Sequence, residues 1–152
     1  MSYADQDRIE KVVELAAPVS RVWRALTDHE EFGRWFRVRL DGPFEIGATT
    51  TGRMTYPGHE DVEWVSTTER LEPERVFAFS WPPSAVDPDT EYDKEAKVLV
   101  EFRLEPTDGG TRLTITESGF LQFPDAKRLE VLRSNAEGWD IQAKNVAAHV
   151  AG

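Results

Sequence analysis

The chain has no cysteine among its 152 residues. It therefore forms no disulfide, carries out no thiolate chemistry and offers no sulfur ligand to a metal ion. No stretch approaches the roughly 20 apolar residues that a membrane-spanning helix needs. The first residues, MSYADQDRIE, contain no apolar core of a secretory signal. These absences predict a cytoplasmic protein without a membrane span.

Basic residues are scarce: 18 lysines and arginines stand against 28 acidic residues, for a net charge of −10. Nucleic-acid binding depends on basic side chains that neutralise phosphates, so we expect no nucleic-acid partner. His29, His59 and His149 show no pair at the helical i, i+4 spacing of a zinc site. We therefore predict no metal and no cofactor. Each histidine is expected to be a solvated surface residue, with His59 the nearest to a functional role.

The last quarter of the chain, from Asp125 to Val150, is predicted to form one long amphipathic helix. One face carries the apolar stripe, and Lys127, Arg128, Glu137 and Lys144 fall elsewhere on the wheel. Such a helix needs a broad apolar surface to lie on. The stripe consists of Leu129, Leu132, Ala136, Trp139, Ala143, Val146, Ala147 and Val150.

Two positions on this helix lie away from the stripe. Gly138 costs about 1 kcal/mol of helix stability against alanine. We attribute it to the close approach of a neighbouring segment or a slight bend, rather than to space for a ligand. Ile141 lies opposite the stripe, which leaves a dimer contact open.

The rest of the chain reads mostly as strands. Strand-like alternation and turn signals predict an α+β fold in which a curved antiparallel sheet of about six or seven strands wraps around the long C-terminal helix. Two short helices follow the first strand: Val19 to Thr27, after Pro18, and HEEFGRWF, capped by Asp28. A polar, acidic loop is expected at 82–93. The predicted strands are Arg8 to Ala16, Ala48 to Tyr56, Val62 to Leu71, Val76 to Trp81, Glu95 to Leu104 and Thr111 to Phe120.

Four stretches, in this order, give the chain a family resemblance: AAPVSRVWRALTDHEEFGRWF, LEPERVFAFSW, GGTRLTITESGF and EGWDIQAKNVAAHV. It resembles the START-like (SRPBCC) superfamily of helix-grip proteins, and within it the homologues of the C-terminal domain of the activator of the heat-shock-protein-ninety ATPase. The resemblance implies a single domain over 1–152, in which 1–7 is expected to be a flexible tail.

The resemblance also implies an apolar cavity between the terminal helix and the sheet, which would bind a small hydrophobic molecule such as a lipid. Five tryptophans are present. Trp23 is expected to be ordinary core, whereas the other four are divided evenly between core and cavity lining. The candidate ligand-binding residues are Trp35, Phe36, Met54, Tyr56, Trp64, Phe79, Trp81, Phe102, Phe120, Leu132, Asn135, Trp139 and Ala143.

Two rival functions stay open. A cyclase- or hydrolase-like enzyme would need a buried ionisable group in the cavity. Glu117 shares its strand phase with Leu113 and Ile115 and is expected to be partly covered, but one carboxylate alone assigns no catalytic role. The other rival, a module that binds a chaperone, rests on the family's name.

Overall fold

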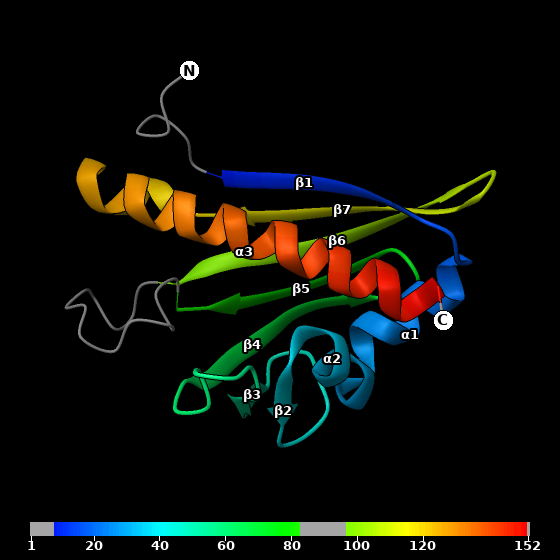
Figure 1. Ribbon diagram of the computed structural model, residues 1–152, viewed down its shortest axis with the longest axis horizontal. Helices are drawn as coiled ribbons and strands as arrows, with labels where there is room; N and C mark the ends of the chain where they lie inside the picture. The colour runs from blue at the N-terminus through cyan, green and yellow to red at the C-terminus, as the bar shows by residue number, and fades with distance from the viewer. Residues whose placement is uncertain (1–7, 83–96, 152) are drawn as a thin grey trace.

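The computed structural model describes residues 8–82 and 97–151 (Figure 1). Seven strands form one sheet in the order β1-β7-β6-β5-β4-β3-β2, and every neighbouring pair is antiparallel. This confirms the predicted fold class. The strands are β1 (Arg8–Leu15), β2 (Val38–Leu40), β3 (Thr49–Met54), β4 (Glu63–Glu72), β5 (Val76–Trp81), β6 (Val98–Thr107) and β7 (Gly110–Ser118).

The helices are α1 (Val19–Thr27), α2 (His29–Phe36), the 3-10 turn η2 (Phe120–Gln122) and α3 (Asp125–Ala151). The sequence predicts α1 and α2 with these bounds, and Asp28 caps α2 by accepting hydrogen bonds from the backbone N–H groups of Glu30 and Glu31. In Figure 1, α3 runs diagonally across one face of the sheet. None of the helices within 8–82 and 97–151 is long and apolar enough to cross a membrane.

The last strand is shorter than predicted. We expected it to extend to Phe120, but β7 ends at Ser118 and Phe120 begins η2. The cause is Gly119, whose φ of 109° turns the chain out of the extended conformation. Residues 1–7 and most of the predicted loop at 82–93 lie outside the described residues.

The apolar stripe of α3 faces the sheet, as predicted. Leu132, Trp139, Val146 and Val150 are buried. Arg128 corrects the expectation that it lies away from the interior, since only 8% of it is exposed. Its guanidinium donates hydrogen bonds to backbone carbonyl oxygens of η2 and the residue that follows it, at 3.1 and 2.9 Å. Those carbonyls would otherwise be poorly satisfied, which explains why an arginine is held there.

The face of the sheet toward α3 carries the core. Along β6, alternate residues are buried, and they include Phe102. Phe32 of α2 lies fully buried among aromatic rings, stacked on Phe36 at a centroid distance of 5.1 Å and edge-on to Trp64 at 5.6 Å. The two short helices therefore close one end of the space between sheet and α3.

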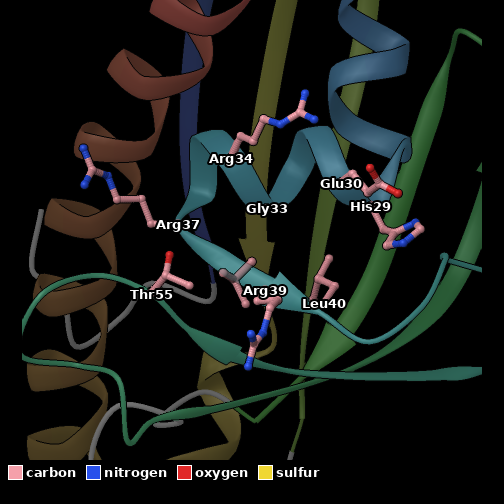
Figure 2. A pocket seen from close by; sticks show the side chains of 9 residues that line it. His29, Glu30, Gly33, Arg34, Arg37, Arg39, Leu40 and Thr55 are labelled. Atoms are coloured by element: carbon pink, nitrogen blue, oxygen red, sulfur yellow. The ribbon is translucent and has the colours of Figure 1, made fainter.

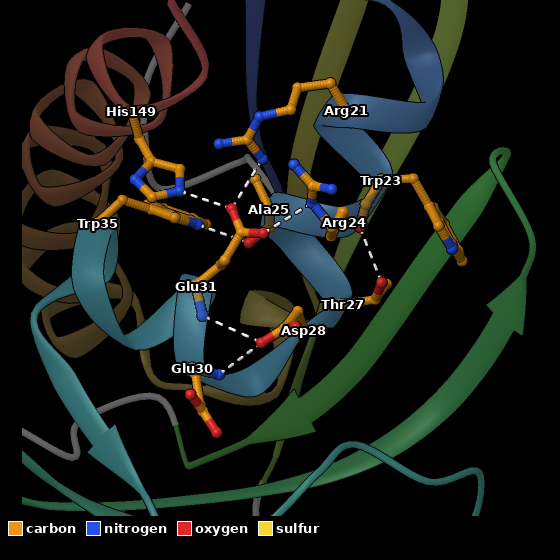
Figure 3. Close-up of polar contacts among 10 residues, drawn as sticks. All are labelled: Arg21, Trp23, Arg24, Ala25, Thr27, Asp28, Glu30, Glu31, Trp35 and His149. Carbon is orange, nitrogen blue, oxygen red and sulfur yellow. Dashed lines mark hydrogen bonds and ion pairs between the residues drawn. The ribbon is translucent and has the colours of Figure 1, made fainter. Parts of the chain in front are cut away.

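A cluster of charges joins the three helices on the surface (Figure 3). Glu31 of α2 accepts from Arg21 at 2.7 Å and pairs with Arg24 at 2.8 Å, both from α1. His149, near the end of α3, lies 2.8 Å from Glu31 Oε1. The side chain of His149 is 18% exposed, so the expectation of a solvated histidine is wrong at this position. The contact between His149 and Glu31 joins the last turns of α3 to α2.

Candidate ligand pocket

A pocket with a volume of about 340 Å³ opens beside the middle of α3. Its walls come from α2, the ends of β3 and β5, the start of β4, the turn before β4, and one flank of α3. His59 and Glu63, which are exposed, belong to the rim. The pocket is thus open on one side instead of being enclosed between helix and sheet.

Four aromatic side chains form the apolar wall: Phe36, Trp64, Trp81 and Trp139. Their rings pack against one another, with centroid distances of 5.1 Å between Trp64 and Trp81 and 5.9 Å between Trp81 and Trp139. Phe36 contacts Trp64 edge-on at 5.1 Å. Such mutually supported rings hold a fixed surface, so the wall exists before any ligand arrives.

Glu117 of β7 lies fully buried behind this wall. Three lining residues donate hydrogen bonds to it: Trp81 Nε1 to Oε2 at 2.6 Å, Trp139 Nε1 to Oε1 at 2.9 Å, and Asn135 Nδ2 to Oε1 at 3.1 Å. Burial raises the pKa of Glu117, and the bonds from Trp139, Trp81 and Asn135 lower it only in part. Glu117 was expected to be partly covered, but it is fully buried. Its carboxyl group accepts hydrogen bonds from three residues of the pocket lining and so fixes their orientation.

The structure brings six of the thirteen candidate residues together at this pocket: Phe36, Met54, Trp64, Trp81, Asn135 and Trp139. Four others, Phe79, Phe102, Phe120 and Leu132, are fully buried in the core away from the pocket.

The remaining three candidates lie apart from the lining residues. Trp35 is buried, and its indole N–H donates to the Ala25 carbonyl oxygen at 2.8 Å. Ala143 is half-buried, and Tyr56 is 44% exposed, with its ring against that of His59.

Gly138 corrects the sequence-based interpretation. It lines the pocket, and a Cβ built on it would meet no atom within 4 Å, so no neighbouring segment approaches closely. Sequence reasoning missed it together with Ser134 and Gln142. The three recur at a spacing of four, which places them on one helix flank. That spacing was the available signal, since a curved sheet leaves one flank of a crossing helix uncovered.

A second hollow, of about 460 Å³, lies where α2 meets β2 (Figure 2). Arg34, Arg37 and Arg39 line it together with polar and apolar neighbours. Figure 2 shows that the three guanidinium groups point in different directions, so they do not converge on one anion. Although this hollow is larger, its walls lack the apolar surface typical of a ligand site. Within the described part of the chain, no cluster of three or more histidine, aspartate or glutamate side chains could hold a metal ion.

Solved structures share the fold. A crystal structure of protein MLL2253 from Mesorhizobium loti has a TM-score of 0.76 and 21% identity, covering 95% of this chain and 96% of that one. A solution structure of a protein from Arthrobacter aurescens has a TM-score of 0.76 and 19% identity, covering 97% and 88%. Protein Ms6760 from Mycobacterium smegmatis has a TM-score of 0.75 and 19% identity, covering 99% and 95%.

No curated protein matches the chain. A family model does: the one described as Activator of Hsp90 ATPase homolog 1-like protein matches residues 16–151, nearly the whole chain. With the strand order and the position of α3, this match confirms the resemblance on which the sequence analysis relied. The chain belongs to the Activator of Hsp90 ATPase homolog 1-like family, within the START-like helix-grip proteins.

Proposed function

We propose that this protein binds a small, largely hydrophobic molecule in the pocket beside α3. The observation that carries the proposal is the wall of four aromatic rings around a volume of about 340 Å³. That volume falls within the range of roughly 300–1,000 Å³ for ligand sites, and the lining combines apolar surface with a few polar groups.

The test uses the tryptophans as reporters. Trp64, Trp81 and Trp139 line the pocket, so a bound molecule changes their emission. We expect saturable fluorescence changes with at least one member of a panel of fatty alcohols, sterols, aromatic polyketides and alkylamines. Native mass spectrometry of the purified protein should show the same molecule as an added mass. If neither tryptophan fluorescence nor native mass spectrometry detects binding of any molecule in the panel, the proposal is contradicted.

A matched pair of variants localises the binding. Gly138→Phe places a ring in the pocket, because the space around Gly138 is open. Glu137→Phe adds the same ring one residue earlier, at an exposed position that does not line the pocket. We expect Gly138→Phe to abolish binding and Glu137→Phe to retain it. Equal binding by the two variants would place the ligand elsewhere.

One observation favours a second candidate, an enzyme. A buried carboxyl with a raised pKa next to a pocket is the setting in which general acids and bases are found, and Glu117 meets that description. An enzyme would convert a bound molecule, and Glu117→Gln would stop the conversion while binding persisted. If mass spectrometry recovers the bound molecule unchanged after long incubation, the binding function stands and the enzyme does not.

A further inference from the structure

We infer that the pocket beside α3 selects apolar molecules that carry a cationic nitrogen, an amine or an ammonium group, and discriminates against carboxylates. The inference rests on the proposed function, because it names the ligand class of the same pocket. Four observations support the inference: the N–H groups of the lining donate to the protein itself, Asn135 Oδ1 is an unused acceptor, the charged residues near the pocket are acidic, and aromatic rings form its wall.

The hydrogen-bond donors of the deepest wall point away from the ligand space. Trp81, Trp139 and Asn135 line the pocket, yet each donates its side-chain N–H to Glu117. A buried carboxylate deprived of these donors would be strongly destabilised, so the donors are not free to turn toward a ligand.

The other two N–H donors of the lining are engaged as well. Trp64 Nε1 donates to Ser66 Oγ at 2.9 Å, and Gln142 Nε2 donates to the Phe36 carbonyl oxygen at 3.2 Å. An incoming carboxylate would therefore lose its hydration without gaining any of the three indole N–H groups, and the amides of Asn135 and Gln142 each keep only one uncommitted N–H. Ser134 and His59 are the remaining lining side chains that can donate.

An acceptor, by contrast, is available. The amide of Asn135 presents its NH₂ group to Glu117, whose Oε1 accepts the hydrogen bond. Its Oδ1 is then directed away from Glu117. Among the described residues, Oδ1 has no hydrogen-bond partner. The lining therefore offers an oxygen to a ligand that donates.

The charge near the pocket is negative. Glu117 lies behind the wall and Glu63 at the rim, and none of the described lysines and arginines lines the pocket. Arg53 lies 3.7 Å from Glu63, but both side chains are more than half exposed, so solvent screens this pair. Glu117 is out of reach of solvent, so when it is ionised it contributes the stronger field inside the pocket.

The aromatic wall of the pocket also suits a cation. The indole rings of Trp81 and Trp139 line the pocket while their N–H groups are committed to Glu117, so the ligand space meets ring surface there instead of N–H donors. Cations are attracted to the faces of aromatic rings, most strongly to tryptophan. Four rings and a buried carboxylate together favour a positively charged nitrogen attached to an apolar body.

The test compares three probes with one alkyl chain: decylammonium, decanol and decanoate. Each is titrated into the wild-type protein below its micelle concentration, at neutral pH and about 0.15 M ionic strength to screen surface charge, with tryptophan emission as the readout. We expect decylammonium to bind about tenfold or more tightly than decanoate, with decanol between them. Binding of decanoate as tight as that of decylammonium would overturn the inference but leave the proposed function intact. If no probe binds and the wider panel is silent, the proposed function itself fails.

Variants distinguish a ligand preference caused by the pocket from one caused by the acidic surface. Glu117→Gln should narrow the preference between ammonium and carboxylate, whereas Glu10→Gln, an exposed residue of β1, should retain it. Equal loss of preference in both would assign the effect to surface charge and overturn the inference. Asn135→Leu, at a half-buried position, removes the free acceptor oxygen. It should also weaken ammonium binding, and it serves as the test if Glu117→Gln does not fold.

Discussion

Glu117 is a charged residue type in a fully buried position. In the folded protein, desolvation disfavours the ionised form of Glu117, whereas three donated hydrogen bonds favour that form. Desolvation prevails, and the pKa is raised above the value of about 4.3 for an exposed glutamate. The neutral form is therefore favoured more in the folded chain than in the unfolded chain.

This shift predicts a pH dependence of stability. Because the folded-state pKa of Glu117 is raised, its contribution to the free energy of unfolding is fully present below the unfolded pKa and is lost as the pH rises through the folded pKa. Glu117→Gln does not titrate at this position. The free energy of unfolding of the wild type, minus that of Glu117→Gln, should therefore fall as the pH rises from about 4.3 and then level off. Urea denaturation at a series of pH values measures this difference. A difference that stays constant with pH would contradict the assignment.

At the scale of the helix, two glycines illustrate opposite requirements. Gly33 lies inside α2, and a Cβ there would lie 2.3 Å from the carbonyl oxygen of Val38 in β2. Backbone atoms cannot easily shift to relieve such a contact. β2 therefore passes this close to α2 because residue 33 has no Cβ. Gly138 lies inside α3 with open space around it.

The two positions predict opposite effects of one substitution. Gly138→Ala should raise the free energy of unfolding by about 1 kcal/mol, since alanine is the better helix former and meets no neighbour. Gly33→Ala should lower it by about 1–3 kcal/mol, because overpacking outweighs the gain in helix propensity. Thermal and urea unfolding of the two variants check the signs. A stabilised Gly33→Ala would mean that β2 does not approach α2 as closely as the structure has it.

At the scale of the whole molecule, the polar cluster of Glu31 with Arg21, Arg24 and His149 connects helices from the two ends of the chain. It joins α1 and α2 to the last turns of α3, and Glu31 and His149 lie 118 residues apart in sequence. Partial burial raises the pKa of Glu31, but hydrogen bonds from His149 and Arg21 and the charges of Arg21 and Arg24 outweigh it, so the pKa is lowered.

We predict that Glu31→Gln lowers the free energy of unfolding by about 2 kcal/mol at neutral pH. Because the folded pKa of Glu31 is lowered, its contribution is present above the unfolded pKa of about 4.3 and is lost as the pH falls through the folded pKa. The cost of the substitution should therefore shrink in acid. Glu30→Gln, an exposed neighbour, is the matched control and should change stability little. Equal destabilisation by both variants would show that the cluster does not hold the helices together.

The sequence predicts the elements better than it predicts the site. Periodicity locates α1, α2 and the inward phase of Glu117 and Trp81, because phase is a local property. It misses β2, which has only three residues. Phe79 and Trp81 share a phase, yet only Trp81 lines the pocket, because position along a strand decides this. The partners of Glu117 lie 18–36 residues away in sequence, and no local pattern encodes them.

The strand order has a consequence for how the chain assembles. β1 lies at the edge of the sheet, and β7 is its strand neighbour, with Leu15 opposite Thr111. During synthesis at about 5–20 residues per second, β1 therefore waits roughly 5–20 s for its strand partner to be made. In that interval its charged residues, such as Glu10 and Lys11, keep the unpaired strand from joining other chains. Of the seven described strands, the one made first is thus among the last to be built into the sheet.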